Sequence, residues 1–148
     1  MIHHPRELDR PHLVREGFGA LGAGADIAWT PDVRTHVELL SLRIAFTTDA
    51  TVANRLMVPI IGPVGNDDFA FPCPVAQIAT RSYEYYWGRD VGCFWTANFA
   101  NYWEGPLPSG LLFSYPEQLR TGIVNIQAGD QITGYTIRYQ LWQDPVAL

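Results

Sequence analysis

The stretch HVELLSLRIAFTT, residues 36–48, decides the fold. Successive side chains of a β-strand point to opposite faces, so a strand here would divide its residues into two sets. The first set is almost wholly apolar and is expected to face the core; it comprises Glu38, Leu40, Leu42, Ile44 and Phe46. The second set lies on the other face; it comprises Val37, Leu39, Ser41, Arg43 and Ala45. The pattern therefore predicts a long strand with one buried face.

The same period of two continues along most of the chain from residue 25 onward. Further strands are predicted over residues 26–30, 52–61, 80–87, 91–99, 111–114, 122–126 and 131–142. Residues 52–61 are expected to pair antiparallel with residues 36–48, because the connection is short. The last strand should place Tyr135, Ile137, Tyr139 and Leu141 inward.

The number and spacing of these strands predict the fold class. Eight or nine short strands, frequent turn signals and no long helical pattern indicate an all-β, antiparallel β-sandwich. A jelly-roll of two four-stranded sheets is preferred because the strand count matches. An immunoglobulin-like order of strands is the second choice.

The first 25 residues differ from the rest of the chain. Pro5 and Pro11 break helical structure, and residues 17–25 hold four glycines, which make ordering costly in entropy. Residues 1–25 are therefore predicted to be an extended, flexible N-terminal arm, with the sandwich domain at residues 26–148. The arm should order against a partner through its best contact residues, which are Arg15, Phe18 and Leu21.

The composition excludes several classes of function. The net charge of −5 and the absence of a basic cluster argue against nucleic-acid binding. The apolar runs are too short to span a bilayer, and the N-terminus lacks the apolar core of a signal peptide, which favours synthesis in the cytoplasm. All ten basic residues are arginine. The use of arginine without lysine reflects either codon bias or surfaces that are covered in an assembly, where arginine is favoured.

No catalytic or metal-binding pattern is recognisable, and no cofactor is expected. No serine lies in a Gly-x-Ser-x-Gly turn, and Cys73 and Cys93 fit no metal spacing. The pair Asp67–Asp68 lacks the spacing of a calcium loop. An enzyme of the cupin type, which would require a histidine-rich metal site, is the least favoured class.

Aromatic residues are concentrated between residues 83 and 103. A sandwich core would use about half of them, and adjacent aromatics in one strand must point to both of its faces. The surplus is expected to form a surface for protein contact or for stacking on a sugar; the candidates are Tyr86, Trp87, Trp95 and Trp103.

Four segments resemble small structural proteins of tailed bacteriophages. The most distinctive is residues 37–55, VELLSLRIAFTTDATVANR, which is similar to a strand of the form ELLSVR-x-x-x-TTDATVANR in those proteins. Similar pieces follow in the same order: PVAQ at residues 74–77 with the strand at 82–87, LPSGLL at 107–112, and NIQAGDQ at 125–131. The resemblance covers about residues 27 to 142.

The resemblance implies a virion protein without an active site. It implies a capsid decoration (cement) protein that binds the major capsid protein, forms homo-oligomers (trimers above all) and resides on the capsid surface after assembly in the host cytoplasm. A tail or head–tail component is the alternative within the same class. A carbohydrate-binding module that uses the aromatic residues is the alternative outside it.

Overall fold

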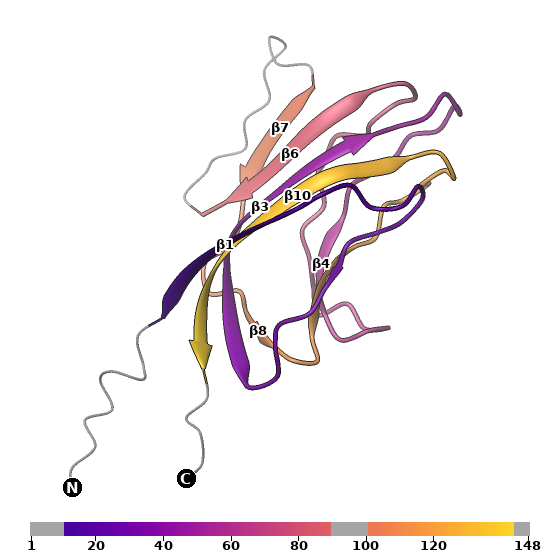
Figure 1. Cartoon of the computed structure of the whole chain (residues 1–148). Coiled ribbons are helices and arrows are strands. Elements are labelled where there is room, and N and C mark those ends of the chain that lie inside the picture. The colour runs from indigo at the N-terminus through magenta and orange to yellow at the C-terminus, as the bar shows by residue number, and fades with distance from the viewer. Residues whose placement is uncertain (1–10, 90–100, 144–148) are drawn as a thin grey trace, which may run out of the picture.

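The computed structural model describes residues 11–89 and 101–143, which form two β-sheets packed face to face. In the larger sheet the strands follow the order β1 (His12–Phe18), β10 (Gln131–Gln143), β3 (Thr35–Thr47), β6 (Ser82–Gly88) and β7 (Tyr102–Pro106), and β8 (Leu112–Ser114) also pairs with β3. In the smaller sheet the order is β2 (Ala28–Trp29), β9 (Gln118–Thr121), β4 (Pro59–Gly62) and β5 (Phe69–Ala70). Figure 1 shows the larger sheet as one twisted layer with β4 in the layer behind it. The predicted all-β sandwich is confirmed.

The order of strands is less regular than the jelly-roll that the sequence suggested. The described sheets have six and four strands in place of four and four, and β7 runs parallel to β6 while the other pairs are antiparallel. The jelly-roll itself is not confirmed. The predicted pairing of residues 52–61 with residues 36–48 is wrong, because β4 lies in the smaller sheet beside β5 and β9. The segment before β4 makes two isolated antiparallel bridges outside the named strands, Arg55 to Gln77 and Leu56 to Val124.

A bulge in β3 changes which face of the strand is buried. The pairing with β10 shifts so that Tyr139 lies opposite Leu39 while Arg138 lies opposite Ser41, which leaves Leu40 as an extra residue. An extra residue reverses the alternation of side chains beyond it. Leu42, Ile44 and Phe46 are buried as predicted, but before the bulge the core receives Val37 and Leu39 in place of Glu38 and Leu40.

The predicted alternation of inward and outward side chains in the final strand, β10, is confirmed. Tyr135, Ile137 and Tyr139 are buried in the core, and Leu141 packs against its margin. This strand lies between β1 and β3, and its inward side chains belong to a core that contains residues of both sheets. The larger sheet therefore presents one face to the core and the opposite face outward.

Residues 11–25 do not form a flexible arm, so the prediction for this part of the chain is wrong. Residues 12–18 form β1, which pairs with β10 over its whole length, from His12 opposite Leu141 to Phe18 opposite Tyr135. The backbone continues against the same strand, because the amide of Leu21 donates to the carbonyl of Ile132 at 2.9 Å. Long-range strand pairing offsets the entropy that the glycines cost. Residues 1–10 of the predicted arm lie outside the described residues.

The described residues contain strands, turns and irregular segments. Among them there is no helix long and apolar enough to cross a membrane.

Candidate interaction surface

Two of the three residues predicted to bind a partner, Phe18 and Leu21, pack against this chain itself. The ring of Phe18 stacks on Tyr135 with the centroids 4.4 Å apart and the planes 12° from parallel. Leu21 is half-buried and packs against the core. Arg15, by contrast, is exposed on the outer face of β1. The alternation from Val14 to Phe18 was the available signal for this strand, and the glycine-rich stretch beginning at residue 17 obscured it.

Replacing Phe18 by alanine is expected to lower the free energy of unfolding by about 2 kcal/mol, because a half-buried aromatic ring loses its stacking partner. Leu13 on the same strand is the matched control: it is 62% exposed, and its replacement by alanine should change stability by less than about 0.5 kcal/mol. Urea denaturation of the two variants measures the difference. Equal stability of Phe18→Ala and the wild-type chain would mean that the ring is not part of the folded domain.

Two of the four predicted surface aromatics are core residues. Trp87 and Trp103 are 1% and 3% exposed, and their rings contact each other at 5.1 Å. Trp103 lies directly over Gly105, where a Cβ atom would collide with the indole ring. The prediction that these two tryptophans form a binding surface is therefore wrong. Trp95 lies outside the described residues, and Tyr86 does lie on the outer face of β6.

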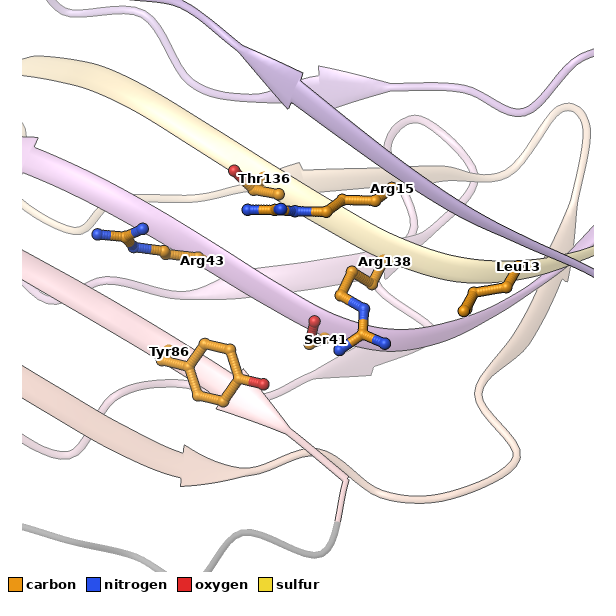
Figure 2. Close-up of a pocket in the computed structure, with 7 residues that line it drawn as sticks. All are labelled: Leu13, Arg15, Ser41, Arg43, Tyr86, Thr136 and Arg138. Atoms are coloured by element: carbon orange, nitrogen blue, oxygen red, sulfur yellow. The ribbon is translucent and has the colours of Figure 1, made fainter.

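The outer face of the larger sheet carries a shallow hollow rich in arginine, which we call the arginine face. The hollow has a volume of about 520 Å³. Its lining comes from four neighbouring strands, and the residues are Leu13, Arg15, Ser41, Arg43, Tyr86, Thr136 and Arg138. Figure 2 shows Arg15 extending across the sheet toward Thr136, and Arg138 extending toward Ser41. The sequence predicts a contact role for only two of these residues, Arg15 and Tyr86.

Strand register explains why the arginines converge. Arg15 of β1 lies directly opposite Arg138 of β10, and Arg43 of β3 lies opposite Thr136, the next outward residue of β10. Arg43 donates to Glu84 Oε1 at 2.6 Å, in an ion pair whose side chains are 51% and 44% exposed. No ion pair within the described residues involves Arg15 or Arg138. Guanidinium groups beside hydroxyl groups form a site suited to a carboxylate or a phosphate.

A second polar cluster is buried, and we call it the Arg55 network; it comprises Asp49, Arg55, Gln77, Tyr85 and Asp130. Arg55 and Asp130 are each 0% exposed. Arg55 Nε and Nη2 donate to the two Asp130 oxygens at 2.8 and 2.9 Å, and Nη2 also donates to Asp49 Oδ1 at 2.7 Å. Its Nη1 donates to two backbone carbonyls, each at 2.8 Å. All five N–H donors of the guanidinium therefore have acceptors, as a buried arginine requires.

Gln77 connects this cluster to the aromatic core. The hydroxyl of Tyr85 donates to Gln77 Oε1 at 2.7 Å, and Gln77 Nε2 donates to the carbonyls of Phe46 and Arg81 at 3.2 and 2.9 Å. Burial raises the pKa of Tyr85 far above its usual value, so the phenol remains protonated and able to donate. The network is a structural element, because its polar groups are satisfied within the fold.

The ionisation of Asp130 depends on the same contacts. Burial by itself would raise the pKa of Asp130, but hydrogen bonds from Arg55 and from the amides of Gln127 and Asp49 outweigh it and hold the pKa below its usual value. The charged form of Asp130 is therefore the one that stabilises the fold.

Acid is expected to weaken the fold through Asp130. Since this carboxyl has a lower pKa in the folded chain than in the unfolded one, its contribution is complete above the unfolded value of about 3.9 and is lost as the pH falls through the folded value. The difference in unfolding free energy between wild type and Asp130→Asn should therefore narrow from about pH 7 to about pH 3. Urea denaturation at both pH values measures it, and a constant difference would contradict the role of the carboxylate.

The described residues offer no arrangement of three or more His, Cys, Asp or Glu side chains that could hold a metal ion. Asp67, in the acidic pair whose spacing does not fit a calcium loop, is ion-paired with Arg120. Cys73 is buried, and Cys93 lies outside the described residues. Comparison with known proteins finds no family model that matches the chain and no similar curated protein.

Proposed function

We propose that this chain is a non-enzymatic structural protein of a tailed-bacteriophage virion. In its most specific form the proposal is a capsid decoration (cement) protein that binds the major capsid protein and stabilises the capsid lattice. It would act as a homo-oligomer, with a trimer favoured, on the surface of a capsid assembled in the host cytoplasm. It would require no cofactor and contact neither nucleic acid nor membrane.

The proposal rests chiefly on the way the phage-like segments meet in space. Arg55 ends the most distinctive segment, Gln77 ends the second, Tyr85 belongs to the strand that follows it, and Asp130 belongs to the last. The structure joins all four in the Arg55 network, although Arg55 and Asp130 are 75 positions apart. A sequence resemblance that includes buried residues which bind one another is more informative about the fold than a resemblance in one surface strand. This arrangement supports the proposal that the resemblance extends to residues in the interior of the fold.

The arginine face supplies a second line of support. It is a broad, shallow and exposed part of a sheet, and it combines arginine, tyrosine and hydroxyl groups. Arginine and tyrosine are enriched at protein interfaces. A protein that works through contacts on a lattice needs a surface of this kind.

The alternative of a carbohydrate-binding module is weakened by the burial of Trp87 and Trp103. A sugar-stacking platform needs exposed ring faces, and these two rings pack in the core. A tail or head–tail component remains the alternative within the phage class, since the same resemblance supports it.

Fractionation of phage particles tests the proposal. Heads and tails from the phage encoding this chain would be separated on a density gradient, and each fraction would be digested and examined by mass spectrometry for peptides of the chain. We expect the peptides in the head fraction at an abundance comparable to the major capsid protein. Their presence in tails alone would support the alternative, and their absence from particles would refute a virion role.

The oligomer proposed above has its own test. Light scattering after size-exclusion chromatography should give a mass three times the 16.6 kDa of one chain. A monomer at high micromolar concentration would contradict trimer formation in solution, without bearing on the presence of the chain in particles.

A further inference from the structure

We propose that the arginine face is a docking site for an acidic peptide segment, whose Asp or Glu side chains bind Arg15 and Arg138. This goes beyond the function proposed above and does not depend on it, because it names the chemistry of the ligand and not the assembly that contains it. The two arginines lie side by side on the outer face of the sheet. They are directly opposite residues on adjacent antiparallel strands, β1 and β10, where Cα atoms are about 5 Å apart.

Two like charges in that position repel each other, and the pair is destabilising unless an anion lies between or beside them. Three acidic side chains on the strands that form the face already have partners within the chain. Glu84 pairs with Arg43, Glu38 pairs with Arg89 at 3.3 Å, and Glu16 accepts from the hydroxyl of Tyr139 at 2.6 Å. The two arginines thus form a local positive charge on a chain whose net charge is −5. An external anion would remove the repulsion.

The groups around the two arginines can complete an anion site. Ser41, Thr136 and Tyr86 place hydroxyl groups in the same hollow, and within the described residues no side-chain hydrogen bond occupies them. Guanidinium groups bind carboxylates through two parallel N–H donors, and hydroxyl groups add neutral donors beside them. The hollow of about 520 Å³ spans four strands, so it offers room for several residues of an extended peptide.

Charge and geometry favour an acidic peptide over the other occupants. Nucleic-acid binding at physiological salt draws on many phosphate contacts, and three arginines on a protein of net negative charge provide few. A second copy paired through β1 about its central residue would set Arg15 opposite its own equivalent, with both Arg138 side chains close by. Four guanidinium groups would then share one row, which like-charge repulsion opposes. A segment rich in Asp or Glu needs no large set of phosphate contacts, and its negative charges are attracted to the two arginines.

A binding measurement with matched variants tests the inference. A fluorescein-labelled oligoglutamate peptide is titrated with the full chain in about 20 mM NaCl, and its anisotropy is recorded. The test variant is Arg15→Gln with Arg138→Gln. The control is Arg34→Gln with Arg81→Gln, which removes the same charge at two exposed arginines outside the hollow. An oligothymidylate with the same number of charges is the competing ligand.

We expect the wild-type chain and the control to bind the peptide alike, and the Arg15/Arg138 variant to bind it at least about tenfold more weakly. The variant should unfold at the same temperature as the wild-type chain or higher, because a repulsive pair has been removed. Equal weakening in both variants would overturn the inference, and so would the absence of peptide binding by the wild-type chain. Tighter binding of oligothymidylate would assign the face to nucleic acid, and dissociation of an oligomer in the Arg15/Arg138 variant would assign it to a second copy; either result would overturn the acidic-peptide site.

Discussion

Asp130→Asn is expected to lower the free energy of unfolding by about 3–5 kcal/mol, although the side chain keeps its shape. Asp130 is completely buried and accepts from Arg55 through both oxygens. The amide would turn an N–H donor toward the donors of Arg55 and leave that guanidinium inadequately paired. The same substitution weakens the acceptor for the amides of Gln127 and Asp49, which lie 2.7 and 2.9 Å away. Chemical denaturation followed by tryptophan fluorescence measures the loss.

A double-mutant cycle separates the ion pair from other effects of the substitution. Arg55→Met should cost a similar amount, because it leaves the Asp130 carboxylate buried without its cation. The double variant should cost about 1–3 kcal/mol less than the sum of the two single changes, since neither charge then remains alone. The exposed pair of Arg43 and Glu84 is the control: Glu84→Gln should change stability by less than about 1 kcal/mol. Additive losses in the cycle would contradict the direct pairing of Arg55 and Asp130.

Trp87→Ala is expected to cost about 3–5 kcal/mol, because it opens a large cavity where the two sheets meet. Trp87 is 1% exposed, and its ring stacks on Tyr85 with centroids 5.9 Å apart and planes 15° from parallel. It also meets Phe71 of the facing layer edge-on at 5.9 Å. Together with the contact to Trp103 at 5.1 Å, the substitution removes packing against three rings.

The neighbouring residue is the control for Trp87. Tyr86 points to the outer face of β6, so Tyr86→Ala should reduce stability by no more than about 1 kcal/mol. Thermal unfolding of the two variants side by side distinguishes them. A larger loss for Tyr86→Ala than for Trp87→Ala would mean that β6 presents the opposite face to the core.

Much of the fold was predictable because alternation of side chains is a local signal. It identified β10 and the inner face of the second half of β3, and together with the turn signals it predicted the class of fold. The same rule failed for Val37 and Leu39, because the extra residue Leu40 inverts the alternation and nothing local marks it. Bulges depend on the pairing between strands, which one sequence does not contain.

Contacts between distant residues explain the remaining errors. Residues 12–18 carry an alternating pattern, but whether they pair with β10 depends on contacts across more than 100 positions. The sequence predicts a surface role for Trp87 because its strand carries aromatics on both faces, and for Trp103 because it belongs to the same aromatic cluster. It does not say which of these rings point inward. Nothing in the sequence distinguishes Arg43 and Arg138 from other outward-facing residues of a strand. Only the register that aligns β1, β10 and β3 brings them together with Arg15.

An image of the capsid tests most directly the proposal that this chain acts by contact on a phage capsid. An icosahedral reconstruction by electron cryomicroscopy of heads purified from the phage encoding this chain would be searched for the two-sheet fold described here. We predict density for the sandwich outside the capsid shell, repeated at equivalent lattice positions and contacting the major capsid protein. A shell that bears no such density, in particles that contain the chain, would contradict the account.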